Sequence, residues 1–523
     1  RDTALEGDLR NGPDGSVTIA ARIDGAGRDI INGGTLTVGG ADRPGRVTGL
    51  DQLVNSGIVS VGAGSVIGAR QISNAEGGDL TVAGSVNGAV ESAAGGTIRL
   101  ADGTVSGSLR NEGALSGTGR VTGTLTNRGT AAIGGGVGRI DNAGQLTTQG
   151  DLTAGRLDNG GTTTVRADDR LTVAETVVNG GQLRVLGVLD GSVLGGGALL
   201  GNGTITGAVE SRGRMDWSGR IDGRLLNAGT ASLSGQVGGA LRNEGQLQLS
   251  GDLSVGGVLR NVGGDAAGPA AAAPGGATLQ VGRGQTLSVA GGIVNEAGAD
   301  LTNDGRIAAT IDNRGTYRQT GTLAGSLASR GEAVVLGAVT GDLDFVSGRL
   351  TLGEAARIGG TLTLRQDYAV EAGTVLDAAR TVVAQDTRLD LDGRLAGALA
   401  SEGVVAVSGR GASVEGTLTN AGRVDLSGDR RTDGLLTVGG LEGAGGALRL
   451  DVDLAEMTAD RVVVRGGAVT GDIRLDLNRT GSGSVSQPGR RVTLLDVDDG
   501  FAAGNSFGYS ANTDFAASER IVF

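Results

Sequence analysis

Short stretches in which apolar and polar residues alternate recur along the chain, and glycine separates them. A representative unit covers residues 241–253 and reads Leu-Arg-Asn-Glu-Gly-Gln-Leu-Gln-Leu-Ser-Gly-Asp-Leu. Its template is apolar-x-Asn-x-Gly-x-apolar-x-apolar, and residues 109–115, 125–131, 225–231 and 418–424 follow it. Alternation with a period of two predicts short strands with one buried face. Gly and Asn predict tight turns between these strands, because both residues tolerate a left-handed backbone.

The template asparagines give the period of the repeat. They are Asn11, Asn32, Asn55, Asn74, Asn111, Asn127, Asn142, Asn159, Asn179, Asn227, Asn243, Asn261, Asn295, Asn313 and Asn420. Serine is predicted to replace asparagine at Ser92, Ser211, Ser329, Ser347 and Ser401. Asn11 and Asn420 are 409 residues apart (420 − 11), and counting the skipped positions gives about 23 intervals of about 18 residues each.

A repeat of this kind predicts an all-β solenoid. Strands this short bury too little surface alone, whereas stacked coils bury a continuous core of Val, Leu and Ile. We therefore predict a parallel β-helix of roughly 24 coils, in which each strand pairs with its equivalent one coil away. Stacked turns would place the asparagine amides in a ladder. Its expected members are Asn111, Asn127, Asn142, Asn159, Asn227, Asn243, Asn261, Asn313 and Asn420.

A β-sandwich or barrel is the competing all-β interpretation. It requires antiparallel hairpins and larger side chains, to fill a wider core. The chain has 1 Trp, 3 Tyr and 5 Phe among 523 residues, which suits a narrow aliphatic core better. We therefore divide the chain into a β-helical stem over residues 1–440 and a different C-terminal region over residues 441–523.

Two segments interrupt the repeat within the stem. Residues 263–278 are rich in Gly, Ala and Pro and show no strand pattern, so we expect a surface loop. This loop is interpreted either as a recognition element or as a tolerated insertion. Residues 354–400 form a second zone in which the asparagine template fades, and we expect irregular coils there.

Composition excludes several classes of chemistry. The chain has 103 Gly, no Cys and no His, and all 45 basic residues are Arg. Nucleophile systems based on His, disulfides, Cys-ligated zinc and Schiff-base lysines are therefore excluded. The net charge of −12 is interspersed, which argues against nucleic-acid binding. No run of 18 apolar residues occurs. The sequence begins at Arg1 without a signal peptide, so we expect a processed or excised fragment.

The sequence pattern changes at about residue 441. Residues 441–454 run from a Leu-x-Gly-x-Gly segment into an alternating strand, and residues 459–464 read Ala-Asp-Arg-Val-Val-Val. Further strand patterns follow at residues 473–478 and 491–497. In order and spacing, residues 441–500 resemble the pertactin-like passenger–barrel junction of type Va autotransporters. The junction positions that match are Asp460, Arg461, Val462, Val463, Val464, Gly467 and Gly471.

This resemblance implies a secreted passenger domain, a right-handed parallel β-helix displayed on the bacterial cell surface. It implies an outer-membrane β-barrel after residue 523 as the passenger's own partner and a signal peptide before Arg1. In the family the junction acts as an autochaperone that caps the β-helix. The upstream repeats also resemble filamentous haemagglutinin-like exoproteins, but those lack this junction.

Aromatic residues are concentrated at the C-terminus. Phe501, Phe507, Tyr509 and Phe515 lie within the last 23 residues, and Phe523 ends the chain. The open end of a β-helix exposes strand edges and core, which large rings can cover. We therefore predict a cap formed by Phe501, Phe507, Tyr509 and Phe515. A linker whose rings pack elsewhere is the alternative.

The candidate catalytic and metal sites are weak. Residues 504–508 match Gly-x-Ser-x-Gly around Ser506, but that motif needs a histidine base. The pairs Asp390 with Asp392 and Asp451 with Asp453 each lie two residues apart on an expected strand, so each pair should share a solvated face. Asp168 and Asp169 fall in a predicted turn.

Two further motifs have ordinary structural explanations. Residues 76–79 and 263–265 match a calcium-roll repeat only in part and do not recur. Trp217 is interpreted as a core or groove residue, with sugar stacking as the alternative. We predict no enzyme activity, no cofactor and no metal.

The leading hypothesis is a non-enzymatic passenger that acts in adhesion, autoaggregation or biofilm formation. Its expected partners are host or bacterial surface receptors or glycans, or the chain itself. Repeated shallow faces would give avidity. Two alternatives stay open: a carbohydrate-active enzyme on the same scaffold, which needs three or more convergent carboxylates, and a passive spacer that presents an N-terminal functional domain.

Overall fold

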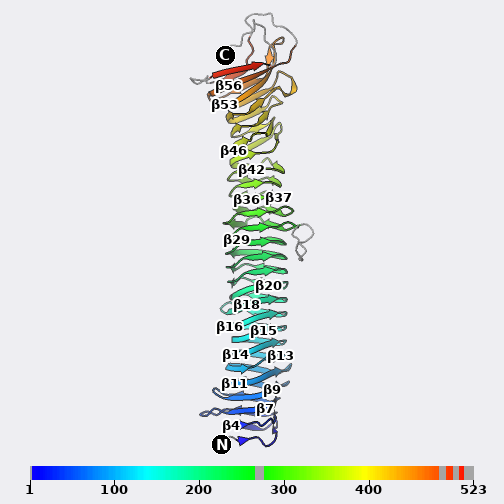
Figure 1. Ribbon diagram of the computed structural model, residues 1–523, viewed down its shortest axis with the longest axis vertical. Coiled ribbons are helices and arrows are strands. Elements are labelled where there is room, and N and C mark those ends of the chain that lie inside the picture. The colour runs from blue at the N-terminus through cyan, green and yellow to red at the C-terminus, as the bar shows by residue number, and fades with distance from the viewer. Residues whose placement is uncertain (1–2, 265–275, 482–490, 499–505, 512–523) are drawn as a thin grey trace. The chain divides into compact units, whose positions relative to one another are not determined.

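The computed structural model describes residues 3–264, 276–481, 491–498 and 506–511. Over these residues the protein is a parallel β-solenoid of about 23 turns with about 18 residues per turn, as the sequence predicts (Figure 1). The described residues contain no α-helix, and η1 (Ser427–Asp429) is a single 3-10 turn. Contacts divide the chain into unit 1, with Arg1–Leu259, and unit 2, with Arg260–Ala266 and Thr278–Phe523.

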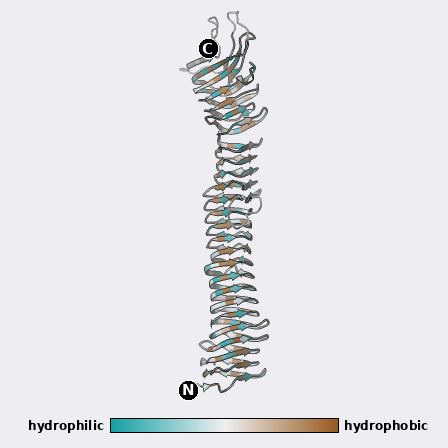
Figure 2. Ribbon diagram, turned by 45° about the vertical axis from the view of Figure 1, so that its right-hand side comes forward, coloured by the Kyte–Doolittle hydropathy of each residue, from teal (hydrophilic) through white to brown (hydrophobic). Residues whose placement is uncertain are grey.

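The alternation of the sequence explains each strand. In β6 (Thr35–Val38), Leu36 and Val38 are buried, and Thr35 and Thr37 are partly exposed. Figure 2 shows the same alternation of apolar and polar residues along the strands. Every second side chain therefore enters the core, and burial of aliphatic surface drives the stacking of the coils.

Each coil of unit 1 contributes a segment to three parallel sheet faces, which we name A, B and C. Face A contains the asparagine positions; its segments lie in, or end, β2 (Leu9–Asn11), β5 (Ile30–Asn32), β7 (Arg46–Asn55), β9 (Val66–Asn74), β11 (Ser85–Ser92), β13 (Leu109–Asn111), β14 (Ala114–Asn127), β15 (Thr130–Asn142), β16 (Gln145–Asn159), β18 (Arg170–Asn179), β20 (Val188–Gly195), β23 (Val209–Ser211), β26 (Leu225–Asn227) and β28 (Leu241–Asn243). Face B contains the first segments of β14, β15 and β16, together with β3 (Ser16–Ile19), β6, β8 (Ile58–Val61), β10 (Asp79–Val82), β12 (Thr97–Ser106), β17 (Thr162–Val165), β19 (Gln182–Val185), β21 (Ala198–Gly201), β24 (Arg214–Trp217), β27 (Thr230–Val237) and β29 (Gln246–Val255). Face C contains the remaining segments of the long strands, together with β1 (Thr3–Ala4), β4 (Arg22–Asp24), β22 (Thr204–Ile205) and β25 (Arg220–Ile221).

Unit 2 repeats the three faces. Its face A contains β30 (Leu259–Asn261), which begins at the last residue of unit 1, and β33 (Ile293–Asn295), β36 (Ile311–Asn313), β39 (Leu327–Ser329), β42 (Leu343–Phe345), β44 (Arg357–Leu364), β46 (Val375–Val383), β49 (Ala398–Ser401) and β51 (Ala412–Asn420). Faces B and C contain β31 (Thr278–Val281), β32 (Thr286–Val289), β34 (Asp300–Asn303), β35 (Arg306–Ala308), β37 (Thr316–Gln319), β38 (Thr322–Leu323), β40 (Glu332–Val335), β41 (Ala338–Val339), β43 (Arg349–Leu352), β45 (Tyr368–Val370), β47 (Arg388–Leu391), β48 (Arg394–Leu395), β50 (Val404–Ala406) and β52 (Arg423–Asp425).

The C-terminal part of unit 2 adds different sheet elements. Its strands are β53 (Leu435–Asp453), β54 (Thr458–Ala459), β55 (Arg461–Val464), β56 (Val469–Arg479), β57 (Leu495–Val497) and β58 (Ser506–Ala511). β54 pairs antiparallel with the end of β53, whereas β55 and β56 pair parallel with it. β53 runs without a break across residues 440 and 441, where the sequence analysis places a boundary.

The asparagine ladder lies in the core of face A. In unit 1, each Nδ2 donates to the Oδ1 of the next coil at 2.8–2.9 Å along Asn111, Asn127, Asn142, Asn159 and Asn179. Asn227 donates to Asn243 in the same way at 2.8 Å. In unit 2, the run is Asn261, Asn295 and Asn313, each step again at 2.8 Å. The ladder therefore satisfies amides that would otherwise be costly to bury.

Asparagine does not occupy every ladder position. Ser92, Ser211, Ser329 and Ser401 take it in their coils, as the sequence predicts. The prediction for Ser347 is wrong, because Phe345 pairs with Ser329 and takes the position. Longer turns shift the spacing there. In unit 2, Asn420 pairs with Ser401, and its Nδ2 donates to the carbonyl of Ala447 at 3.2 Å.

The coils over residues 354–400 are more regular than the sequence suggests. β44 and β46 pair parallel in continuous register, and buried Leu364 and Val383 occupy the ladder column. The asparagine template fades there because the column becomes apolar. Of the predicted loop at 263–278, residues 265–275 lie outside the described residues.

Glycine columns set the tightness of the turns. A Cβ on Gly229 would lie 2.1 Å from the carbonyl oxygen of Gly213, and a Cβ on Gly245 would lie 2.1 Å from that of Gly229. No side chain fits there, since such an approach is far inside van der Waals contact. Glycine at this corner is therefore a steric requirement of stacking rather than only a means to a left-handed backbone.

Candidate functional site

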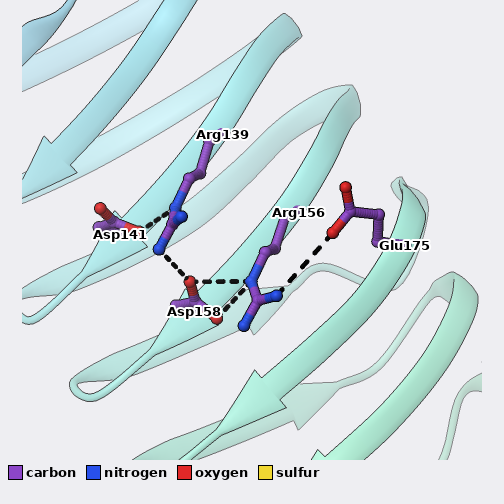
Figure 3. Close-up of polar contacts among 5 residues, drawn as sticks. All are labelled: Arg139, Asp141, Arg156, Asp158 and Glu175. Carbon is purple, nitrogen blue, oxygen red and sulfur yellow. Dashed lines mark hydrogen bonds and ion pairs between the residues drawn. The ribbon is translucent and has the colours of Figure 1, made fainter.

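Face A presents paired charges outside the asparagine ladder. In unit 1, Arg139 binds Asp141 at 2.8 Å in its own coil and Asp158 at 2.6 Å in the next coil (Figure 3). Arg156 binds Asp158 at 2.9 Å and approaches Glu175 at 3.9 Å. The chain of contacts thus links successive coils along the outer surface.

The same arrangement recurs on other coils. In unit 1 the ion pairs of face A also include Arg110 with Glu112, Arg128 with Glu112, Arg212 with Glu210, and Arg242 with Glu244. In unit 2 they are Arg260 with Glu296, Arg314 with Asp312, Arg330 with Asp312, and Arg365 with Asp344. Most partners are two residues apart or one coil apart, because these spacings place side chains on one face.

These exposed pairs have modest energetic effects. The hydrogen bond from Arg110 lowers the pKa of Glu112, and the hydrogen bond from Arg70 lowers the pKa of Asp51. The pairs are solvated, so each adds little to stability. Their main consequence is a surface on which positive and negative groups alternate closely.

We expect stability to be independent of pH over a wide range. The chain lacks His, Cys and Lys, so its side chains leave no ordinary titration between about pH 6 and 9. The pKa values of Asp51 and Glu112 are lowered in the folded chain, so the unfolded chain binds protons first as the pH falls. Their contribution is present above about pH 4.5 and is lost at lower pH. Thermal unfolding followed by circular dichroism between pH 3 and 9 measures this, and a stability step centred between pH 6 and 8 would contradict it.

The predicted carboxylate pairs do not converge on common partners. Asp390 binds Arg388 at 2.7 Å, whereas Asp392 follows the strand and accepts from the Ser408 hydroxyl at 2.7 Å. Asp168 is exposed, and Asp169 accepts from the Thr148 hydroxyl at 2.6 Å. Each carboxylate therefore has a local structural contact.

The prediction of a solvated face for Asp451 is wrong. Asp451 is fully buried and accepts a hydrogen bond from the Asn478 side chain. Asp453 is only partly buried and accepts from the backbone N–H groups of Ala455 and Glu456 at 2.8 and 3.1 Å. The alternation fails here because β54 folds back on the end of β53, so the strand is covered on a side that is open elsewhere.

The predicted junction residues surround a buried carboxylate. Asp460 is fully buried, and its two oxygens accept from the N–H groups of Gly434 and Asp451 at 2.9 and 2.7 Å. Val462, Val463 and Val464 follow it in β55 and are also buried. Asp460 thus connects the turn before β53 with the end of that strand.

The other junction positions lie at the edge of this cluster. Arg461 approaches Asp496 at 3.8 Å on the surface. A Cβ on Gly467 would lie 2.3 Å from the Gly439 carbonyl, and a Cβ on Gly471 would lie 2.2 Å from the Gly443 carbonyl. Both glycines therefore repeat the steric rule of the turns.

Part of the predicted cap lies outside the described residues. Phe501 and Phe515 are among these, as is Asp265 of the partial calcium motif. Phe507 and Tyr509 lie in β58, whose backbone pairs parallel with β56. Ser506 begins this strand, so the Gly-x-Ser-x-Gly segment enters a strand and not the helix that a nucleophile elbow needs.

Trp217 is a core residue. It is 3% exposed, and its neighbour one coil earlier in the same column is Gly201. The absence of a side chain at Gly201 leaves space beside the indole. The indole is therefore not positioned to stack on a sugar.

One repeated contact was not predicted from the sequence. An aspartate in a turn accepts from a hydroxyl 16 residues later at 2.6–2.7 Å; the pairs are Asp102 with Thr118, Asp190 with Thr206, Asp304 with Thr320, and Asp392 with Ser408. The spacing matches one short coil. A search for Asp and Thr or Ser at this separation would have found it.

The described residues contain no group of three or more acidic side chains that could hold a metal ion. Within the same residues, no helix is long and apolar enough to cross a membrane. Comparisons of the sequence with known protein families and with curated proteins find no match.

Proposed function

We propose that the chain is the passenger domain of an autotransporter, displayed on a bacterial surface, where it acts in adhesion, autoaggregation or biofilm formation without enzymatic activity. The observation that carries this proposal is the stacking of short strands into long, continuous sheet faces. Such faces offer many equivalent contacts of low individual strength, and many weak contacts held together give high avidity.

The C-terminal region supports the passenger assignment. The residues that resemble the family junction, from Asp460 to Val464, form a buried cluster against β53. In the proposed role this cluster stabilises the end of the stem nearest the secretion barrel. The alternating charges of face A suit contact with polar surfaces, since they are already solvated.

The test is gain of function in a non-adherent Gram-negative host. We expect expression of the complete gene that encodes this chain to increase both cell sedimentation and attachment to abiotic or host-cell surfaces. A host that displays the same secretion barrel without residues 1–440 is the control. Verified surface display with no gain in sedimentation or attachment would contradict the proposal.

A further inference from the structure

Face B of unit 1 differs in chemistry from face A. Most of its outward side chains carry hydroxyls or amides, and they stack in continuous register from coil to coil. These residues are Ser16, Thr18, Thr35, Thr37, Ser60, Thr81, Thr97, Ser116, Thr130, Gln145, Thr147, Thr162, Thr164, Gln182, Thr230, Ser232, Gln246 and Gln248.

Few charges interrupt this face. They are Asp79, Arg99, Arg184, Arg214 and Asp216, so the face carries three Arg against two Asp. Arg214 and Asp216 also form an ion pair with each other. The whole chain, in contrast, has a net charge of −12. Face B of unit 1 is therefore a surface on which two copies of an acidic chain can meet without like-charge repulsion.

The face is also large and regular enough for a stable contact. About 14 strands at about 4.8 Å spacing, each about 13 Å wide, give roughly 850 Å² per copy. A standard protein interface buries about 800 Å² per partner. In-register sheets with small polar side chains can interdigitate closely, as in steric zippers.

We propose that two copies of the chain associate through face B of unit 1. The proposal rests on the self-association part of the proposed function and names its partner as a second copy. The contact is formed by Thr, Ser and Gln side chains, so salt does not dissociate it. An association through the charged face A would weaken as salt rises, because salt screens exposed charges.

Sedimentation velocity of the purified full chain tests this proposal. We expect a concentration-dependent dimer between about 1 and 50 µM that persists in 1 M NaCl. A chain that stays monomeric over this range would overturn the proposal, whereas the host experiment above would still decide the adhesive function. A dimer that dissociates in 1 M NaCl would assign the contact to face A instead.

Charge substitutions locate the contact. Thr130 and Thr162 lie on face B two coils apart, with Gln145 between them in the column. We expect Thr130→Arg with Thr162→Arg to weaken dimerisation at least tenfold, because two sets of unpaired charges become buried. Thr122→Arg with Thr153→Arg is the matched control, since these exposed threonines lie on face C of the same coils. The control is expected to dimerise like the parent chain.

Mixing separates a self-contact from other effects. We expect an equimolar mixture of the Arg variant with Thr130→Asp, Thr162→Asp to regain dimers, because opposite charges then face each other. Circular dichroism and Trp217 fluorescence verify that each variant is folded. Equal weakening by the face B and face C variants, or no recovery on mixing, would overturn the assignment to face B.

Discussion

Gly197→Ala is expected to lower the free energy of unfolding of unit 1 by about 3 kcal/mol or more. A Cβ at this position would lie 2.1 Å from the carbonyl oxygen of Gly181. That oxygen accepts the N–H of Ala198 at 2.7 Å, so the methyl group cannot be accommodated without separating two paired coils. Rigid backbone on the preceding coil leaves no flexible side chain to move aside.

The adjacent residue provides the control. Gly196 is exposed, and a Cβ there would have no atom within 4 Å. Gly196→Ala removes the same backbone freedom from the unfolded chain, so the comparison cancels that entropic term. We expect Gly196→Ala to change stability by less than about 1 kcal/mol.

Urea unfolding followed by fluorescence measures both variants. Trp217 is the single tryptophan of the chain, and its strand β24 pairs with β21, which follows Gly197 directly. The signal therefore reports the coils that the substitution disturbs. Equal unfolding midpoints for the Gly197 and Gly196 variants would contradict the steric explanation of the glycine columns.

Much of the fold could be predicted because one local rule repeats. Alternation with a period of two identifies the strands, and recurrence at about 18 residues can only be satisfied by stacking. The asparagine ladder follows, since a polar residue at a buried position needs a partner at the same place in the next coil. Asn127 and Asn142 illustrate this, because each is buried and they bind each other.

The errors arise where tertiary contacts change the local rule. Ser347 matches the spacing, but a different turn length places Phe345 in the column. Asp451 alternates like a surface residue, but an antiparallel strand covers it. Both depend on how neighbouring chain segments pack, which a short sequence window does not contain.

The candidate surfaces were less predictable than the fold. The ion pairs of face A follow from Arg and acidic residues two positions apart, as in Arg139 and Asp141. The hydroxyl-rich face B becomes visible only when the register of successive coils is known, because its columns join residues 15 to 23 positions apart, such as Thr130 with Gln145 and Thr37 with Ser60. Function then depends on these surfaces and not on the solenoid itself.

Asn127→Leu is the second substitution with a large expected effect. Asn127 is fully buried, accepts from Asn111 at 2.8 Å and donates to the Oδ1 of Asn142 at 2.8 Å and to the Gln145 carbonyl at 2.9 Å. Leucine of similar size removes these contacts and leaves the Asn142 Oδ1 buried without a donor. We expect a loss of about 3 kcal/mol, because each unsatisfied buried group costs about 1–3 kcal/mol.

Serine at the same position distinguishes lost hydrogen bonding from lost packing. Ser92 already occupies a ladder position, where it accepts from Asn74 at 3.4 Å, but the Oδ1 of Asn111 in the next coil has no partner. Serine therefore continues the ladder in one direction only. We expect Asn127→Ser to cost less than leucine, about 1–2 kcal/mol, although it removes more side-chain volume. A simple packing explanation predicts the reverse order.

Asn87→Leu is the surface control, because Asn87 is exposed on face C of the same unit, and we expect a change within about 0.5 kcal/mol. Urea unfolding of the three variants gives the order directly. Leu364 and Val383 show that apolar residues are accepted where neighbouring ladder positions are apolar too. The column is thus stable when it is polar or apolar in runs, and a single leucine among asparagines creates the unsatisfied step. If Asn127→Leu were as stable as Asn87→Leu, the ladder would contribute nothing to the stability of the coils.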